Sequence, residues 1–358
     1  MIDPVALLTH MLDIPSVSTQ EAHLARFLVA QMSRLGFESF VDDAGNAVGI
    51  AGSGPDIVLL GHIDTVAGHV PVRVEGGRLY GRGAVDAKGP FAAFICAAAR
   101  LAGSKALPGR LVLIGAVEEE AASSKGAKYA VTRYNPVACV IGEPSGWDRL
   151  TLGYKGRLLV DGIWKQPAAH SAGREPSAAE RAVACWNAIV DHCTAYNDGR
   201  ARLFDQLLPS LRAIRSWSDG LTEQAEWTVG VRLPPAISPD TLATTITGLA
   251  HGGMLQFHDL CPAYQAEKNT PLVRAFLKGI RVAGGHPGFV LKTGTSDMNV
   301  VGPVWQCPIL AYGPGDSNLD HTPDEHVVIE EFLRAIDVLA IALRSLEEQD
   351  AGGGGARA

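Results

Sequence analysis

The sequence lacks the patterns that mark several large classes of protein. It has no run of Lys and Arg, and its 31 basic residues are outnumbered by 38 acidic ones, so a nucleic-acid or anionic-membrane partner is not expected. No apolar stretch approaches the ~20 residues that a membrane-spanning helix needs. The opening MIDPVALLTHMLDIPS contains acidic residues and a proline where a signal peptide requires a basic start. We therefore expect a soluble, cytoplasmic protein.

Cysteine is sparse and shows no pairing pattern. The 6 cysteines include no Cys-x-x-Cys pair, and several lie in apolar runs. A disulfide framework or a cysteine-bound zinc site is therefore not expected, and the cysteines are interpreted as small buried side chains. With 358 residues, of which 47% are hydrophobic and 19% charged, the chain is long enough for about two globular domains.

Short apolar runs alternate with longer amphipathic ones over residues 1–150. Strands are predicted at Ile57–Leu60, Leu111–Ile114 and Val137–Ile141, with helices at Pro90–Leu101 and Ser124–Arg133. This alternation is typical of an α/β domain with a mostly parallel sheet. Each predicted strand ends in a polar cluster, and ligands bind beyond the carboxyl ends of strands in such sheets. We therefore expect a functional site at that edge.

The middle of the chain has a different order of elements. The pattern predicts strand, helix, strand, strand, helix and strand, at Leu158–Ile163, Pro176–Ala195, Leu211–Trp217, Glu226–Leu233, Thr241–Ala250 and Leu255–Leu260. This β-α-β-β-α-β order is that of the ferredoxin-like fold. The α/β pattern then resumes, with helices at Pro271–Ala283 and Ile329–Leu346 and a strand at Pro308–Tyr312. The prediction is a discontinuous domain of residues 1–154 and 262–347, an inserted domain of residues 155–261, and a disordered tail over residues 348–358.

Histidine and acidic side chains gather near the predicted strand ends. His62 and Asp64 lie two residues apart, so they share a face of an extended chain, and a carboxylate commonly holds the second ring nitrogen of a metal-binding histidine. Adjacent carboxylates beyond a buried strand repel one another unless a cation compensates. Nitrogen and oxygen donors of this kind suit Zn²⁺, Co²⁺ or Mn²⁺. The further candidates are Asp86, the run Glu118–Glu120, Glu143 and His321.

These motifs resemble those of the co-catalytic di-metal peptidase and deacylase family, which includes acetylornithine deacetylase, succinyl-diaminopimelate desuccinylase and glutamate carboxypeptidase. The resemblance rests on GHIDTV, GRGAVDAKG, VEEE, IGEPS and LDHTPDEHV, which follow one another between residues 61 and 326. It implies a catalytic domain with a central mixed sheet and an inserted ferredoxin-like lid that also mediates dimerisation. It further implies two divalent metal ions per chain, with Zn²⁺ expected and Co²⁺ as the alternative.

The resemblance implies a role for each matching residue of the catalytic domain. Asp64 would orient His62, and Glu119 would be the general base, although the triple glutamate leaves this register open by one residue. Asp86 would bridge the two metals. The remaining metal ligands would be His62 and Glu143 on one ion, and Glu120 and His321 on the other.

Residues in and near the insert have implied roles in substrate binding. His170 would reach the site of a neighbouring subunit and stabilise the oxyanion, whereas a loop histidine is otherwise usually just solvated. Arg232 would hold the substrate α-carboxylate, a task that suits its forked guanidinium, although it could equally be a surface arginine. Thr295 and Ser296 lie in GTSD, which resembles a substrate loop of the family.

Within the family, the segments KTGTSDMN and IGEPSGWDRLTLGYKGR resemble the LysW-lysine/ornithine hydrolases. These enzymes release lysine or ornithine from the γ-carboxyl group of the C-terminal glutamate of the acidic carrier protein LysW, in lysine and arginine biosynthesis. The alternatives are an acetylornithine deacetylase or another N-acyl-amino-acid amidohydrolase or dipeptidase with the same machinery. A non-catalytic metal-binding scaffold is disfavoured because the ligand set is complete. The expected partners are the acyl-amino-acid substrate, LysW and a second copy of the chain.

Overall fold

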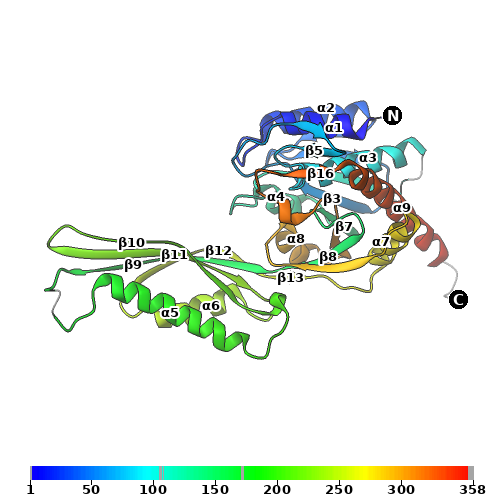
Figure 1. The fold of residues 1–358 in the computed structure, drawn as a ribbon. Coiled ribbons are helices and arrows are strands. Elements are labelled where there is room, and N and C mark those ends of the chain that lie inside the picture. Colours follow the sequence, from blue (N-terminus) through cyan, green and yellow to red (C-terminus); the bar gives the residue numbers. More distant parts are fainter. Residues whose placement is uncertain (1, 105–106, 108, 171–172, 354–358) are drawn as a thin grey trace. The chain divides into compact units, whose positions relative to one another are not determined.

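The computed structural model describes residues 2–104, 107, 109–170 and 173–353 of the chain. The chain divides into two compact units, which Figure 1 shows as a ribbon coloured along the sequence. Unit 1 comprises Met1–Gly153, Ala266–Val290 and Ser296–Ala358, and unit 2 comprises Tyr154–Gln265 and Leu291–Thr295. Across the described residues, no helix is both long and apolar enough to cross a membrane.

The central sheet is mixed and has nine strands in the part of the chain that the structure describes. At its centre, β3 (Asp56–His62) pairs in parallel with β6 (Arg110–Ala116) and β7 (Ala138–Gly142), and β7 pairs in parallel with β15 (Ile309–Ala311). The mixed α/β class is confirmed, and the three strands predicted from apolar runs are neighbours. The other strands of this sheet are β1 (Glu38–Val41), β2 (Ala47–Ala51), β8 (Arg149–Tyr154), β13 (Tyr264–Gln265) and β14 (Gly288–Lys292).

The helices of unit 1 pack against this sheet and against one another. They are α1 (Pro4–Asp13), α2 (Ala22–Arg34), α3 (Lys88–Ser104), α4 (Lys125–Arg133), α7 (Pro271–Val282), α8 (Asp297–Trp305) and α9 (Ile329–Gly353). Helix α3 packs on α1, α9 and β3, and α4 packs on α8. The short elements are a small sheet in the order β16 (His326–Val328), β5 (Arg78–Tyr80) and β4 (Arg73–Glu75), and the 3₁₀ helix η2 (Ser317–Leu319).

Helix α8 begins at Asp297, directly after Thr295 and Ser296 of the GTSD segment. One part of unit 1 differs from the sequence prediction. Helix α9 continues through Gly353, into the segment for which the sequence predicts a disordered tail. Glu347, Glu348 and Ala351 are good helix formers, so the helix extends beyond its apolar residues. Residues 354–358 of the predicted tail lie outside the described residues.

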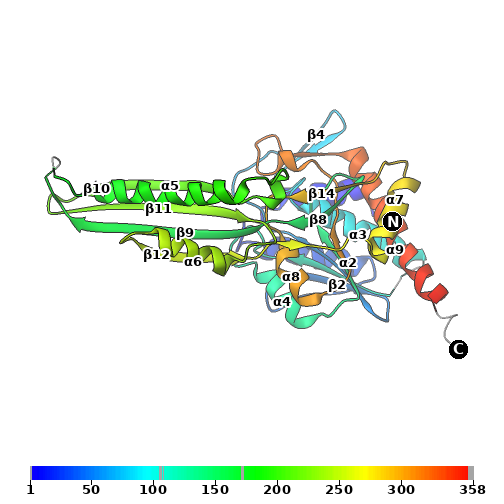
Figure 2. The ribbon, with the colours of Figure 1, turned by 90° about the horizontal axis from the view of Figure 1, so that it is seen from below.

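Unit 2 has the β-α-β-β-α-β order of elements. These elements are β9 (Gly156–Pro167), α5 (Ala178–Asn197), β10 (Leu208–Ser218), β11 (Thr222–Leu233), α6 (Pro239–Leu249) and β12 (Met254–Cys261), with the 3₁₀ helix η1 (Leu203–Asp205) before β10. The strands form an antiparallel sheet in the order β10-β11-β9-β12. Figures 1 and 2 show α5 and α6 on one face of this sheet, where they enclose a core that contains Trp164 and Trp227.

Local sequence sets where the two helices of unit 2 begin. The Ser177 hydroxyl accepts a hydrogen bond from the Glu180 backbone N–H, and the Glu180 side chain accepts one from the Ser177 N–H, which makes a capping box. The Ser238 hydroxyl accepts from the Thr241 N–H, and Pro239 occupies the first helical position, as the sequence predicts.

Small residues allow α3 to pack directly on the parallel strands. Gly61 in β3 and Gly142 in β7 are paired in register, next to Phe91 and Phe94 of α3. A Cβ atom on Gly142 would lie 2.9 Å from the Phe94 ring and 3.0 Å from the Cα of Gly61. This close approach holds the N-terminus of α3, and Asp86 just before it, beside the end of β3.

Replacing Gly142 by Ala should destabilise unit 1 by about 1–3 kcal/mol, because the new methyl group would overlap a buried ring and a neighbouring backbone. Gly103→Ala is the matched control, since a Cβ atom there meets open space. It should leave the stability unchanged or raise it by up to about 1 kcal/mol, because alanine favours the helix. Urea unfolding followed by circular dichroism measures both changes. Equal stability of Gly142→Ala and the parent protein would contradict this account of the packing.

Candidate metal centre

The predicted metal ligands meet at the carboxyl ends of the central strands. Because β3, β6 and β7 run parallel, the residues at their ends lie along one edge of the sheet. Two further side chains come from the loops before α3 and before β16. The strand ends supply His62, Glu119, Glu120 and Glu143, and the loops supply Asp86 and His321.

One group of donor atoms belongs to His62, Asp86 and Glu143, which lie within 4.8 Å of one another. The Nε2 atom of His62 lies 3.0 Å from Asp86 Oδ1 and 4.0 Å from Glu143 Oε1. The imidazole is buried, and its other nitrogen, Nδ1, lies 3.0 Å from the carbonyl oxygen of Asp64. The ring is therefore held with Nε2 toward the carboxylates.

A second group of donor atoms belongs to Asp86, Glu120 and His321. The Nε2 atom of His321 lies 3.0 Å from Asp86 Oδ2 and 2.8 Å from Glu120 Oε1. The two carboxylate oxygens of Asp86 thus face different histidines, with Oδ1 toward His62 and Oδ2 toward His321. A carboxylate in this position can bind two cations at once.

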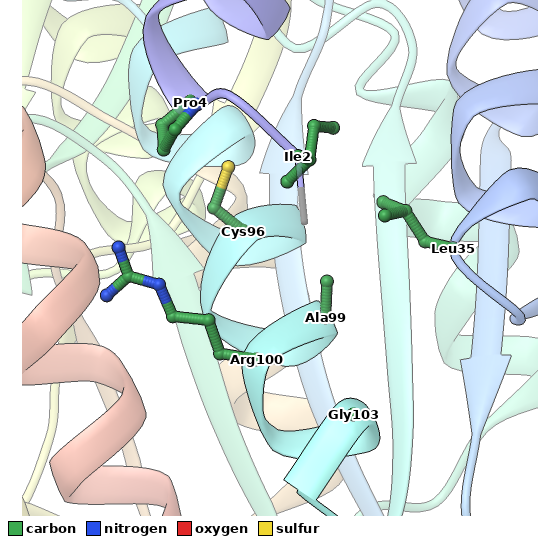
Figure 3. Close-up of a pocket in the computed structure, with 7 residues that line it drawn as sticks. All are labelled: Ile2, Pro4, Leu35, Cys96, Ala99, Arg100 and Gly103. Carbon is green, nitrogen blue, oxygen red and sulfur yellow. The ribbon is translucent and has the colours of Figure 1, made fainter.

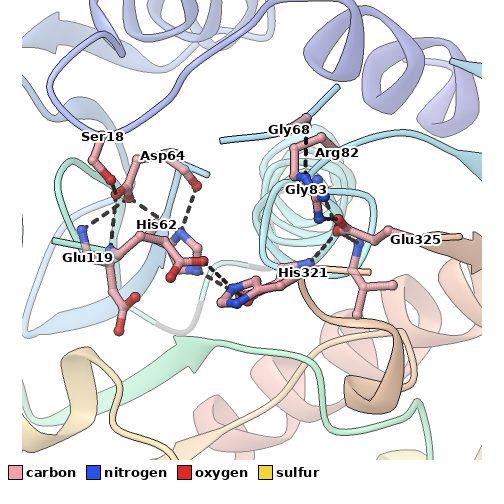
Figure 4. Close-up of polar contacts among 12 residues, drawn as sticks. Ser18, His62, Asp64, Gly68, Arg82, Gly83, Glu119, His321 and Glu325 are labelled. Carbon is pink, nitrogen blue, oxygen red and sulfur yellow. Dashed lines mark hydrogen bonds and ion pairs between the residues drawn. The ribbon is translucent and has the colours of Figure 1, made fainter. Parts of the chain in front are cut away.

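Asp64 organises the backbone around these donors. Its buried carboxylate accepts hydrogen bonds from the Glu119 N–H at 3.1 Å, the Glu120 N–H at 3.0 Å and the Ser18 hydroxyl at 2.7 Å (Figure 4). It also lies 3.4 Å from His62 Nδ1. One side chain therefore fixes the imidazole of His62 and the segment that carries two of the glutamates.

The three consecutive glutamates have different surroundings. Glu118 turns toward Ser123, whose hydroxyl donates to it at 2.6 Å, and toward Lys125 at 3.7 Å. Glu120 contacts His321, as described above. A carboxylate oxygen of Glu119 lies within 4.8 Å of donor atoms of His62 and Glu120.

The carboxyl groups of the centre perturb one another strongly. Burial raises the pKa of Glu119 well above its usual value; His62 opposes this, whereas Glu143 and Asp297 add to it. Burial and the nearby Asp86 likewise raise the pKa of Glu143. Hydrogen bonds that His321 donates to Asp86 and Glu120 raise its pKa to about 10. Divalent cations bound among these acids would stabilise their charged forms.

The donor set fits divalent metal ions. Each group combines carboxylate oxygens with an imidazole nitrogen, which are the donors that Zn²⁺ and related ions take in proteins. The shared Asp86 and the excess of acids over histidines fit two ions better than one. His62 and Asp86 would hold the first ion with Glu143, and Asp86 and His321 would hold the second with Glu120.

The profile of peptidase family M20/M25/M40 matches residues 58–345, a range that includes all six of these donor residues. The chain belongs to this family. The resemblance stated from the motifs is therefore confirmed, and the chain is a member of a family of enzymes that hydrolyse amide bonds.

Relatives within the family are similar over almost the whole chain. A LysW-lysine hydrolase of Deinococcus radiodurans is 46% identical over 95% of this chain and 96% of its own. A Thermococcus kodakarensis protein, provisionally named LysW-lysine/LysW-ornithine hydrolase, is 38% identical over 96% of this chain and 92% of its own. In fold, the chain is similar to an M20 family metallo-carboxypeptidase of Sulfolobus solfataricus, with a TM-score of 0.79, 17% identity, and coverage of 97% of this chain and 100% of that one.

The predicted substrate-binding residues lie apart from this donor set in the sequence, and most belong to unit 2. Arg232 Nη1 donates to the Thr295 hydroxyl at 3.3 Å, so the structure brings these two residues together. His170 is an exposed residue of the loop after β9. Ser296 belongs to unit 1, where its hydroxyl accepts from the Met298 N–H at 3.2 Å and caps helix α8.

Sequence reasoning missed Glu325, which anchors the loop that carries Asp86. Its buried carboxylate accepts hydrogen bonds from the N–H groups of Gly83 at 2.9 Å, Val85 at 3.0 Å and Asp86 at 3.2 Å (Figure 4). Arg82 pairs with the same carboxylate at 2.6 Å. Glu325 therefore joins the segment of His321 to the segment of Asp86. In the sequence it stands in the motif DHTPDEHV, where it could not be distinguished from a solvated acid.

Sequence reasoning also passed over Asp297, although the motif GTSD contains it. Its side chain is buried, and neither carboxylate oxygen has a hydrogen-bond partner among the described residues. Burial raises its pKa to about 7; His62 opposes this shift, and Asp64 adds to it. Asp297 therefore adds a further buried acid to the surroundings of the centre.

A separate cavity of about 530 Å³ lies beside the C-terminal half of α3. It is mostly apolar, with Arg100 as its charged side chain (Figure 3), and Arg100 also pairs with Asp337 at 2.5 Å. Asp86 precedes the opposite end of the same helix, so this cavity is distinct from the candidate metal centre. Its lining residues are Ile2, Pro4, Leu35, Cys96, Ala99, Arg100 and Gly103.

Glu325→Gln should weaken metal binding by about 10- to 100-fold, the usual cost of losing a group that orients metal ligands. The amide keeps one acceptor oxygen, but its NH₂ group would face N–H donors or Arg82, and the Asp86 loop would loosen. Glu330→Gln is the matched control, since Glu330 is exposed and pairs with Arg334 on the surface. Calorimetric titration with Zn²⁺ measures the affinity, and circular dichroism checks the fold. Parent-like affinity in well-folded Glu325→Gln would show that the anchor is dispensable.

Proposed function

We propose that the protein is a metal-dependent amide hydrolase that releases lysine or ornithine from the C-terminal glutamate of a LysW-type carrier protein, in lysine or arginine biosynthesis in the cytoplasm. The main support is the 46% identity, over 95% of the chain, to the LysW-lysine hydrolase of Deinococcus radiodurans. The arrangement of Asp86 between His62 and His321 supplies the chemical support.

In this proposal the centre holds two divalent ions, with Zn²⁺ expected and Co²⁺ as the alternative. Asp86 would be shared by both ions, with His62 and Glu143 as the further ligands of one ion and Glu120 and His321 as those of the other. Such ions lower the pKa of a water molecule toward neutrality and polarise the carbonyl of the scissile amide.

Glu119 is proposed to move the proton in this reaction. It accepts a proton from the attacking water as the new C–O bond forms, and it gives that proton to the amine nitrogen as the C–N bond breaks. Its position suits this role, because a carboxylate oxygen within 4.8 Å of donor atoms of His62 and Glu120 lies beside the place where the attacking water would be bound. Asp64 is proposed to position it, through the hydrogen bond that it accepts from the Glu119 N–H.

A second candidate function differs from this one in its substrate. An acetylornithine deacetylase, or another N-acyl-amino-acid amidohydrolase or dipeptidase, would use the same centre. Assays of the purified, metal-loaded enzyme on LysW-linked lysine, LysW-linked ornithine and acetylornithine separate these possibilities. Turnover of acetylornithine alone would contradict the proposed carrier-linked substrate. If the enzyme hydrolysed none of a broad panel of amides, a non-catalytic metal-binding scaffold would be the better interpretation.

Unit 2 is proposed to act as a lid and to form a homodimer. Strands β10 and β12 are the edges of its sheet, and most of β10 is exposed, so β10 is a template for pairing with a second copy. In the dimer, His170 is proposed to stabilise the oxyanion at the site of the partner subunit. Arg232 is proposed to bind the α-carboxylate of the amino acid, with Thr295 and Ser296 in the same substrate-binding segment.

Substitutions of the three adjacent glutamates test the register of the centre. Glu119→Gln should retain two metals per chain and lower kcat by at least ~100-fold, because proton transfer alone is lost. Glu120→Gln should lower the metal content, and Glu118→Gln is the control that should change neither quantity. Metal analysis and steady-state kinetics on LysW-linked lysine measure these effects. Metal loss in Glu119→Gln, with retention in Glu120→Gln, would show that the assigned register is off by one residue.

Mixing two inactive variants tests whether His170 acts across a dimer. Asp86→Ala lacks the metal bridge and His170→Ala lacks the oxyanion donor, so neither homodimer is active. A mixed dimer contains one site with intact metals and an intact partner histidine. Random exchange should therefore restore up to about a quarter of the parent activity, since half the dimers are mixed and half their sites are competent. Exchange demonstrated by mass spectrometry, without recovery of activity, would exclude a role for His170 across the interface.

A further inference from the structure

Two arginines of unit 2 stand directly opposite each other on neighbouring strands. Arg157 of β9 and Arg232 of β11 are paired in register, so their side chains project from the same face of the sheet. This is the open face, since the intervening positions Leu158 and Val231 belong to the core under α5 and α6. Like charges directly opposite across two strands destabilise a sheet. A bound anion would therefore reduce the repulsion between these two arginines.

A third arginine reaches the same place from β10. Arg212 lies at the irregularity in the β10–β11 pairing, between Leu211 and Ala213. A Cβ atom on Gly230, two residues before Arg232, would lie 3.3 Å from Arg212 Cδ. The aliphatic part of the Arg212 side chain therefore lies over Gly230, on the face of the sheet that carries the other two arginines. Burial lowers the pKa of Arg232, and the charges of Arg157 and Arg212 lower it further.

The positive charge of this arginine cluster, defined as Arg157, Arg212 and Arg232, is not balanced within the protein. Arg157 Nε contacts the carboxylate of Asp259. Among the described residues, neither Arg212 nor Arg232 has a carboxylate partner, and the hydrogen bond of Arg232 goes to the neutral hydroxyl of Thr295. Three guanidinium groups and one carboxylate leave an excess of two positive charges.

A buried lysine near Arg232 is held by backbone groups and is not part of this excess. Lys155 is fully buried, and its ammonium group donates to the carbonyl oxygens of Leu203, Phe204 and Gln206 in and after η1. Burial and, to a smaller extent, the charge of Arg232 lower its pKa to about 8. Lys155 is thus committed to backbone carbonyls, and the arginines remain available for a ligand.

We propose that the arginine cluster binds a second carboxylate of the substrate, the α-carboxylate of the glutamate to which the amino acid is linked, beside the amino-acid α-carboxylate already assigned to Arg232. This inference rests on the proposed function and specifies which acyl group the enzyme selects. Guanidinium groups bind carboxylates through paired hydrogen bonds, which are strong where the arginine is partly buried. An excess of two charges matches a γ-glutamyl-linked substrate, which has a carboxylate on each side of the amide. An acetylated amino acid has only one.

The two roles are divided within the cluster. Arg232 takes the carboxylate of the amino acid. Arg212, which is exposed and comes from the edge strand, takes the glutamate carboxylate beside Arg157. Loss of Arg232 should therefore weaken every substrate, whereas loss of Arg212 should weaken glutamyl-linked ones selectively.

Two compounds that differ by a single carboxylate test this division. The first is Nα-(N-acetyl-γ-glutamyl)-lysine, and the second is Nα-(4-acetamidobutyryl)-lysine, which lacks the α-carboxylate of the glutamyl group. Binding is measured by calorimetry in metal-loaded, full-length protein carrying Glu119→Gln, so that hydrolysis does not interfere. Arg212→Gln should raise the Kd of the glutamyl compound by about 10- to 100-fold, as expected for a hydrogen bond between charged groups, and leave the Kd of the other within about twofold.

Arg215→Gln is the matched control. Arg215 is an exposed arginine of the same strand that already pairs with Glu226, so its loss should change neither Kd. Equal weakening of both compounds in Arg212→Gln, or no change in either, would overturn the proposal. Hydrolysis of the glutamyl compound by protein with Glu119 intact is a separate measurement. Selective binding without hydrolysis would support the arginine site and contradict the proposed function. Hydrolysis without selective binding would support the proposed function and contradict the arginine site.

Discussion

The constraint on which the centre depends is the crowding of buried carboxylates at one edge of the central sheet. Burial raises the pKa of Glu119, Glu143 and Asp297, so the charged form of each is disfavoured there. Two imidazoles cannot balance these acids. A protein that places them together gives up stability unless cations are present, so the cluster itself is a strong argument for metal binding. Because the strands are parallel, this crowding follows from the topology.

The centre holds its ligands by satisfying the backbone around them. Asp64 accepts hydrogen bonds from the N–H groups of Glu119 and Glu120, and Glu325 accepts three from the loop of Asp86. In both cases a buried carboxylate that is not itself a proposed ligand fixes the peptide units that carry ligands or the proposed base. Each contact joins segments far apart in the chain, which makes the position of the donor atoms depend on the whole fold of unit 1.

The parts of this arrangement that depend on local sequence patterns could be predicted from the sequence. Apolar runs located β3, β6 and β7, and the spacing of His62 and Asp64 indicated one face of an extended chain. The anchoring role of Glu325 could not be predicted, because its partners are backbone N–H groups more than two hundred residues away. Likewise, repulsion among Glu118, Glu119 and Glu120 indicates a cation without indicating which of them faces it. Their directions depend on the turn after β6, where Glu118 adopts a left-handed φ of 59°.

The two units concentrate charges of opposite sign. Unit 1 concentrates negative charge, which suits cations and the chemistry of the amide. Unit 2 places Arg157 opposite Arg232, with Arg212 beside them, which suits carboxylates that take no part in bond cleavage. If the rate of hydrolysis depends on the acidic cluster of unit 1 and the choice of acyl group depends on the arginine cluster, a change in the arginines alone would change the amide that is hydrolysed. Proteins with the same metal ligands could then act on different amides. The metal-ligand motifs would then contain little information about substrate, since Arg212 and Arg232 lie outside them and Arg157 lies only at the end of the longer segment IGEPSGWDRLTLGYKGR.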